Sequence, residues 1–246
     1  MTHTSCDSEN RPARAGGGVW LLPITVPALG LAALALVGAD PHTLLSAVAL
    51  AALLAAAIRH LASRSGARLG RASQVTLARA GLVAVLAAAL FEPALYREQG
   101  WTIAGLALLV LALDGVDGWL ARRFDECSEF GARFDMEVDA GLIMVLCLGA
   151  MAADLAGPWV LLIGLMRYGF LLAASVWPWL SAPLPGSFRR KLVCVWQVSA
   201  LVLVITPLVG SPTASILLLS ALVGLVLSFG LDVAWLKRHQ ASPLAT

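Results

Sequence analysis

Long apolar stretches recur along this chain, and they restrict the folds open to it more than any other feature. Hydrophobic residues make up 59% of the 246 residues and charged residues only 13%, which is too apolar for an ordinary soluble domain. Each stretch holds about 20 residues, enough for a helix to cross a hydrocarbon core of about 30 Å. The eight expected membrane spans are residues 19–39, 43–62, 75–91, 101–120, 129–153, 158–176, 191–208 and 213–236. The sequence therefore predicts an all-α, polytopic membrane protein.

Arginine and lysine are concentrated in alternate loops between these spans. They occur near the N-terminus, around the ends of the second, fourth and sixth spans, and after the last span: Arg11, Arg14, Arg59, Arg64, Arg68, Arg71, Arg122, Arg123, Arg133, Arg189, Arg190, Lys191, Lys237 and Arg238. The intervening loops carry only Arg97. Because positively charged loops stay in the cytoplasm, both termini and the loop after the fourth span are expected there. We expect a multi-pass protein of a bacterial inner membrane that contacts the lipid bilayer and no nucleic acid.

Four aspartates lie beside or inside the fourth and fifth spans: Asp114, Asp117, Asp135 and Asp139. A carboxylate at membrane depth is costly unless it is paired or bound to a cation. The first two share one helix face, and the last two share a face of the next helix, which a short polar link folds back toward the first. Oxygen ligands without His or Cys suit Mg²⁺, Ca²⁺ or Mn²⁺ rather than zinc. The pattern predicts a buried site for multivalent cations.

A structural role for these aspartates is the alternative. In that interpretation Arg122 and Arg133 form salt bridges with the aspartates and hold the two helices together. Four carboxylates without a bound metal ion would repel one another, so the cation site is the favoured hypothesis.

The residues around the aspartates follow a fixed pattern. It is Asp114-x2-Asp117-Gly118-x2-Ala121-Arg122-x8-Gly131-x3-Asp135-x3-Asp139. At every fixed position this pattern resembles the signature of the CDP-alcohol phosphotransferase family. The resemblance implies a six-helix membrane core with the signature on its second and third helices. Since the signature here falls on the fourth and fifth spans, residues 72–240 would form the catalytic domain, and residues 1–71 a cytoplasmic N-terminus and two additional helices. A chain that starts near Ser65 is expected to keep its activity.

The resemblance implies an activity in phospholipid biosynthesis. A phosphatidyl group would pass from CDP-diacylglycerol to an alcohol acceptor, with release of CMP. Two Mg²⁺ or Mn²⁺ ions per site would be held by Asp114, Asp117, Asp135 and Asp139, and Asp139 would also be the catalytic general base. The alternatives are transfer of a phospho-alcohol from its CDP ester to diacylglycerol and, from another class, an ion-coupled membrane transporter. We expect a homodimer.

By the same resemblance, Gly118, Ala121, Arg122, Ser128 and Thr76 would bind the CDP part of the donor. Ser128 could instead cap the next helix. Thr76 belongs to a stretch, residues 74–79, that resembles the family's N-x-x-T-x-x-R. The alternative for Thr76 and for the basic residue at the end of this stretch, Arg79, is helix capping and a charge that faces the lipid headgroups.

Three basic residues are candidates for binding the acceptor. Arg167 falls near the middle of the sixth span, where an arginine should meet an anion. That anion is either a carboxylate such as Glu137 or a phosphorylated acceptor. Arg189 lies just before the seventh span and Lys191 begins it. Their alternative is ordinary cytoplasmic charge that contacts anionic lipids. A phosphate-bearing acceptor such as glycerol phosphate is the favoured hypothesis.

Overall fold

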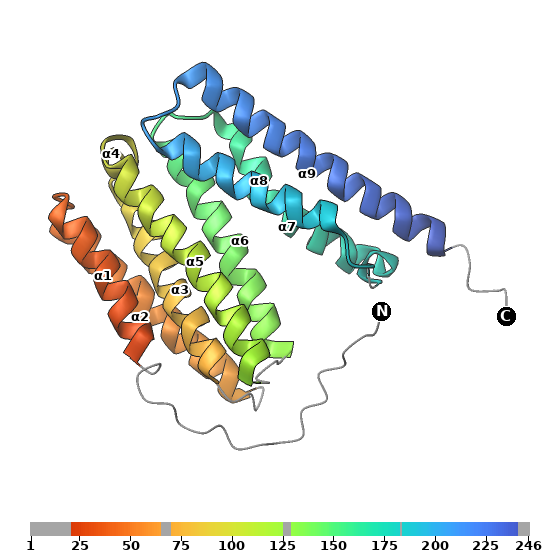
Figure 1. The fold of residues 1–246 in the computed structure, drawn as a ribbon, viewed down its shortest axis with the longest axis horizontal. Helices are drawn as coiled ribbons and strands as arrows, with labels where there is room; N and C mark the ends of the chain where they lie inside the picture. Colours follow the sequence, from red (N-terminus) through yellow and green to blue (C-terminus); the bar gives the residue numbers. More distant parts are fainter. Residues whose placement is uncertain (1–20, 65–69, 125–128, 183, 241–246) are drawn as a thin grey trace. The chain divides into compact units, whose positions relative to one another are not determined.

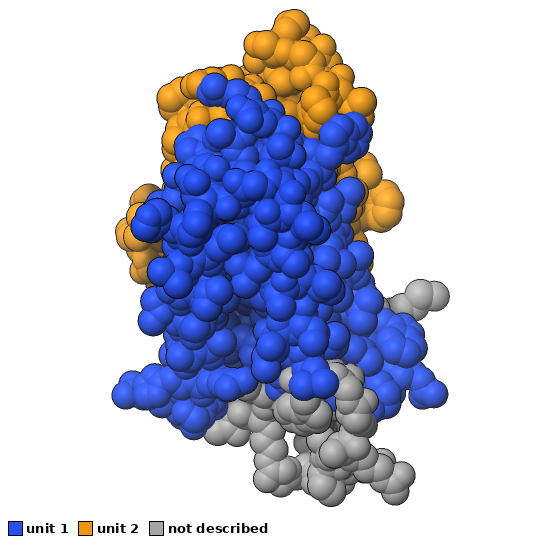
Figure 2. Space-filling view, turned by 90° about the vertical axis from the view of Figure 1, so that its left-hand side faces the viewer, with its two compact units in different colours: residues 1–145 blue, residues 146–246 orange. Residues whose placement is uncertain are grey.

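The computed structural model describes residues 21–64, 70–124, 129–182 and 184–240, and the regular structure in them is helical (Figure 1). The α-helices are α1 (Leu22–Leu36), α2 (Pro41–Arg64), α3 (Arg71–Ala88), α4 (Pro93–Glu98), α5 (Gly100–Phe124), α6 (Glu129–Ala152), α7 (Leu161–Val176), α8 (Phe188–Ile205) and α9 (Ser211–Gln240). The chain forms two compact units, Met1–Val145 and Leu146–Thr246, which Figure 2 distinguishes by colour.

Each of the eight predicted spans corresponds to one of these helices. Five helical segments in the described part of the chain are long and apolar enough to cross a membrane: Pro41–Arg64, Arg71–Phe91, Gly100–Ala121, Pro158–Val176 and Ser211–Arg238. The shorter helix α1 is also apolar. Charged residues at the start of α6 and α8 shorten the apolar part of these two helices. The prediction of an all-α, polytopic membrane protein is confirmed.

Helix α4 was not predicted from the sequence. Pro93 occupies its first turn, where a proline needs no amide donor, and the helix ends after six residues. The buried hydroxyl of Tyr96 donates a hydrogen bond of 2.8 Å to the carbonyl oxygen of Leu86. Burial raises the pKa of this hydroxyl, so it stays protonated as a donor. The link between α3 and α5 is therefore an ordered helix fastened to the end of α3.

Helix α3 is the most enclosed element of unit 1, since every residue from 74 to 86 is buried. It packs against α1, α2 and α5 (Figure 1). A Cβ atom at Gly81 would lie 2.4 Å from Cγ of Pro27, and one at Gly30 would lie 2.8 Å from Cδ2 of Leu82. These two glycines allow α1 and α3 to approach each other closely.

Helix α2 is joined to the same region by a polar contact. The carboxylate of Glu92 accepts hydrogen bonds from the amide of Asp40 (3.0 Å) and from the hydroxyl of Thr43 (3.2 Å). Together with the close packing of α1, this contact makes the N-terminal pair part of the support of α3. The sequence predicted two additional helices whose removal leaves the activity intact, and it did not indicate these contacts with α3.

Candidate metal centre

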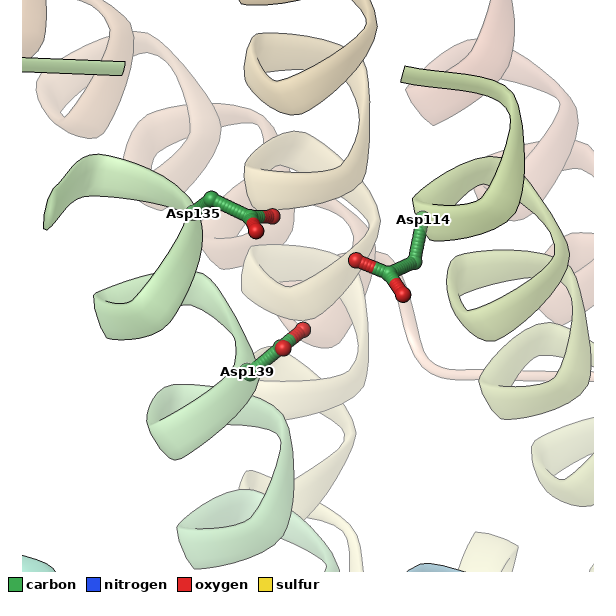
Figure 3. Close-up of side chains that lie close together, drawn as sticks. All are labelled: Asp114, Asp135 and Asp139. Carbon is green, nitrogen blue, oxygen red and sulfur yellow. The ribbon is translucent and has the colours of Figure 1, made fainter. Parts of the chain in front are cut away.

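Helices α5 and α6 bring carboxylates from the two halves of the signature together. One oxygen atom from each of Asp114, Asp135 and Asp139 lies within 4.8 Å of the other two. Figure 3 shows the side chain of Asp114 directed from α5 toward Asp135 and Asp139 on α6. Oxygens on opposite sides of a six-coordinate Mg²⁺ are about 4.2 Å apart, because each bond is about 2.1 Å long. The limit of 4.8 Å exceeds that value only slightly, so small side-chain movements would let these three carboxylates hold one divalent cation.

Asp117, the fourth predicted ligand, has a different environment. It is buried, and its Oδ2 atom accepts hydrogen bonds from the hydroxyl of Thr76 (3.1 Å) and from Nη1 of Arg79 (2.8 Å). The hydroxyl of Thr76 also lies 3.1 Å from the carbonyl oxygen of Ala72, its acceptor one helical turn earlier. Asp117 is therefore held against α3, beside the group of three rather than within it.

Arg79 lies at the centre of all four carboxylates, and its side chain is completely buried. Its Nη1 atom contacts Asp117 (2.8 Å) and Asp135, and its Nη2 atom contacts Asp114 (2.9 Å) and Asp139. Each of these two nitrogens thus joins one carboxylate of α5 to one of α6. The guanidinium provides the positive charge that lets four carboxylates share a small volume in an apolar helical unit.

This arrangement corrects one interpretation made from the sequence. A headgroup-facing Arg79 and a helix-capping Thr76 are both wrong, because Arg79 is fully buried and Thr76 lies inside α3, bonded to Asp117. Arg79 was also absent from the predicted site residues. The signal that could have identified it is an arginine inside a predicted span, since such residues rarely lack an anionic partner.

The predicted CDP-binding residues are only partly described. Gly118 and Ala121 are half-buried on α5, in the same helix as the first two aspartates. The side chain of Arg122 and the whole of Ser128 lie outside the described residues. Thr76 is placed at the centre by its bond to Asp117. Their contacts with CDP stay predictions.

The three predicted acceptor residues all lie in unit 2. Arg167 is partly buried on α7, and Lys191 is exposed on α8. Arg189 donates hydrogen bonds to the carbonyl oxygen of Ser228 (2.7 Å) and to the carboxylate of Asp232 (2.5 Å), both on α9. The sequence analysis did not identify Asp232, because its pairing with Arg189 joins residues 43 positions apart.

A pocket of about 420 Å³ lies beside this ion pair. Three arginines line it together with Asp232 and Trp235: Arg189, Arg190 and Arg238. Arg190 also donates a hydrogen bond to the carbonyl oxygen of Pro185. With three guanidinium groups and one carboxylate in the lining, the pocket of unit 2 has an excess of positive charge.

Comparison with known proteins gives one match. The model of a family described as CDP-alcohol phosphatidyltransferase matches residues 69–228, a stretch that includes Arg79 and the four aspartates. No curated protein and no solved structure matches the chain.

Proposed function

The chain belongs to the CDP-alcohol phosphatidyltransferase family, and from this membership we propose that it transfers a phosphatidyl group from CDP-diacylglycerol to an alcohol acceptor, releasing CMP. Members of the family transfer phospho-alcohol groups in phospholipid biosynthesis. The observation that carries the proposal is the cluster of four carboxylates at the facing surfaces of two apolar helices. Such a cluster suits a reaction whose donor carries an anionic pyrophosphate.

The charge of the cluster supports two divalent ions. Four carboxylates and the guanidinium of Arg79 leave a formal charge of −3. One Mg²⁺ or Mn²⁺ would leave a charge of −1 and two would leave +1, to which the pyrophosphate adds negative charge of its own. We propose that Asp114, Asp117, Asp135 and Asp139 hold both ions. When bound, such ions neutralise the pyrophosphate and stabilise the entering and leaving oxygens.

The residues of the chain would then act on the two substrates as follows. Asp139 accepts the proton of the acceptor hydroxyl as that oxygen bonds to the phosphorus bearing the diacylglycerol group. The bond from this phosphorus to the CMP oxygen breaks, and CMP leaves. Thr76, Gly118, Ala121, Arg122 and Ser128 orient the CDP part of the donor. In this assignment the general base lies on α6, and most of the residues that contact the CDP part lie on α3 and α5.

The membrane setting favours CDP-diacylglycerol as donor, because its acyl chains would lie in lipid and its CDP part in the headgroup region. The experiment that tests the direction of transfer compares donors with the purified protein. We expect CMP release from CDP-diacylglycerol plus a water-soluble acceptor. Release only from CDP-choline or CDP-ethanolamine plus diacylglycerol would reverse the donor and acceptor roles. Divalent-dependent CMP release in either case would exclude the ion-coupled transporter.

For the acceptor, we propose a phosphorylated alcohol such as glycerol phosphate. Arg167, Arg189 and Lys191 are its candidate contacts. Of these, Arg189 lines the pocket of unit 2, whose excess of positive charge suits an anionic ligand. A phosphate must lose its water to react beside four carboxylates, and cations that contact the phosphate offset that cost. Arg167 lies near the middle of the predicted sixth span, where a charge-assisted contact with the acceptor should contribute most.

Replacing Arg167 by Gln should raise the acceptor KM about tenfold or more, the loss expected for one charge-assisted hydrogen bond of about 1.5–3 kcal/mol. The KM for CDP-diacylglycerol should change little. Steady-state kinetics with each substrate varied in turn would measure both values. Arg97→Gln, an exposed arginine on α4, is the control. Loss of donor binding in Arg167→Gln, or use of serine as acceptor, would contradict the assignment.

We also propose that the centre faces the cytoplasm of a bacterial cell and that the protein forms a homodimer. In a background that lacks Cys6, Cys147 and Cys194, we expect a thiol reagent to label Cys127 from the cytoplasmic side only. A Cys introduced at Ala94, which is exposed on α4, should be labelled from the opposite side. The reverse labelling pattern would contradict this orientation.

The homodimer is tested separately by cross-linking in membranes. A monomeric mass after cross-linking would contradict it.

A further inference from the structure

Arg79 and the four aspartates approach one another from different sides. The Arg79 side chain has no exposed surface, and the side chain of Asp117 is only 6% exposed. The side chains of Asp114, Asp135 and Asp139 are 43%, 36% and 39% exposed. The guanidinium of Arg79, a residue of α3, therefore contacts the cluster from the interior. The three carboxylates that fit a divalent cation remain accessible from outside.

A divalent ion on the accessible side would share its ligands with Arg79. Each of the three carboxylates that could hold the ion is already bonded to the guanidinium. An oxygen that donates electron density to a metal ion is a weaker hydrogen-bond acceptor, and the two cations repel each other across a few ångströms. Arg79 cannot be deprotonated to relieve this repulsion, because guanidinium stays charged in proteins. It also has no exposed surface from which it could turn toward solvent.

We infer that Arg79 is a built-in counter-cation that competes with divalent ions for the four carboxylates and so sets the metal affinity of the centre. This inference rests on the cation site of the proposed function and adds the regulation of that site. Arg79 offsets the repulsion among the carboxylates without a metal ion, and it weakens binding of the ion itself. The negative charge of CDP compensates for the repulsion between Arg79 and the metal ion. Metal binding in the wild-type protein is therefore coupled to nucleotide binding.

The test measures Mn²⁺ binding to the purified full chain in detergent, with the free Mn²⁺ quantified by electron paramagnetic resonance. Arg79→Gln keeps hydrogen-bonding capacity but removes the charge. We expect it to bind Mn²⁺ at least tenfold more tightly than wild type in the absence of nucleotide, a change of about 1.4 kcal/mol. We also expect a lower Tm without metal and a larger rise in Tm when Mn²⁺ is added. Addition of CDP should tighten Mn²⁺ binding strongly in wild type and only slightly in Arg79→Gln.

Two further variants separate competition from a general structural role. Glu92→Ala removes the hydrogen bonds to Asp40 and Thr43, which lie outside the cluster, so it should lower the Tm without changing the Mn²⁺ affinity. Arg79→Lys keeps the charge, but its single ammonium group cannot span four carboxylates as the forked guanidinium does. Its Mn²⁺ affinity should fall between those of wild type and Arg79→Gln.

Equal or weaker Mn²⁺ binding by Arg79→Gln would overturn the inference, because Arg79 would then hold the carboxylates in position for the metal. If Arg79→Gln does not fold, an Arg79→Lys affinity at or below that of wild type has the same consequence. Absence of Mn²⁺ binding from wild type and from all variants, with and without CDP, would instead contradict the proposed function.

Discussion

Replacing Asp135 by Asn is expected to lower CMP release by about 10²- to 10⁴-fold, because bound metal ions contribute several kcal/mol to catalysis and each 1.4 kcal/mol is a factor of ten. Asp135 is one of the three carboxylates whose oxygens lie within 4.8 Å of one another. The amide of Asn has nearly the shape of the carboxylate, so the variant can still accept the hydrogen bond from Arg79. What it loses is the negative charge that a hard divalent cation requires. Initial rates of CMP release at saturating donor would measure the effect.

Glu137→Gln is the matched control for this prediction. It removes one negative charge from the same helix, two residues away, at an exposed position outside the cluster. Its turnover should stay within a few-fold of wild type. Near-wild-type turnover of Asp135→Asn, in a sample that unfolds at its normal temperature, would remove Asp135 from the metal ligands.

Asp139→Asn is expected to lower turnover by about 10²- to 10⁴-fold, the contribution of a general base. An unprotonated carboxylate is required to accept the proton of the acceptor hydroxyl. The wild-type rate should therefore rise with pH as this carboxylate loses its proton, and the variant should lack that rise. A pH profile of turnover at saturating metal would measure both the loss of rate and the change of shape.

Mn²⁺ binding separates the two roles proposed for Asp139. If it is mainly the base, the Asn variant should still bind Mn²⁺ within about tenfold of wild type, since three other carboxylates remain. Retention of a wild-type pH profile by the Asn variant would contradict the assignment of Asp139 as the base.

The helices were predictable because a membrane span requires a long apolar stretch, and such stretches are visible without knowledge of any contact. Helix α4 could not be predicted, since its six residues are too few to show a helical period. Its order comes from tertiary contacts such as the hydrogen bond between Tyr96 and Leu86. The close approach of Gly81 to Pro27 is also a tertiary effect, and it is what gives α1 its role beside α3.

The aspartates of the site were predictable for a different reason. Their spacing places Asp114 and Asp117 on one helix face and Asp135 and Asp139 on another, and the short link brings these faces together. The direction of Arg79 was left open because a single arginine near a span end can face either the headgroups or the interior. The tertiary structure decides between these directions. Helix α3 packs against α5, and Arg79 contacts Asp135 and Asp139 on α6.

The most direct test of the central claim is CMP release by the purified full-length protein, supplied with CDP-diacylglycerol and glycerol phosphate, at increasing Mg²⁺ concentrations. We predict that CMP and a new phospholipid form in equal amounts, that both products disappear when EDTA removes the divalent ions, and that Mg²⁺ or Mn²⁺ restores them. CMP release that is unaffected by EDTA, or no CMP release from any CDP-alcohol donor by folded protein with Mg²⁺ present, would contradict a metal-dependent transferase centre built on these four aspartates.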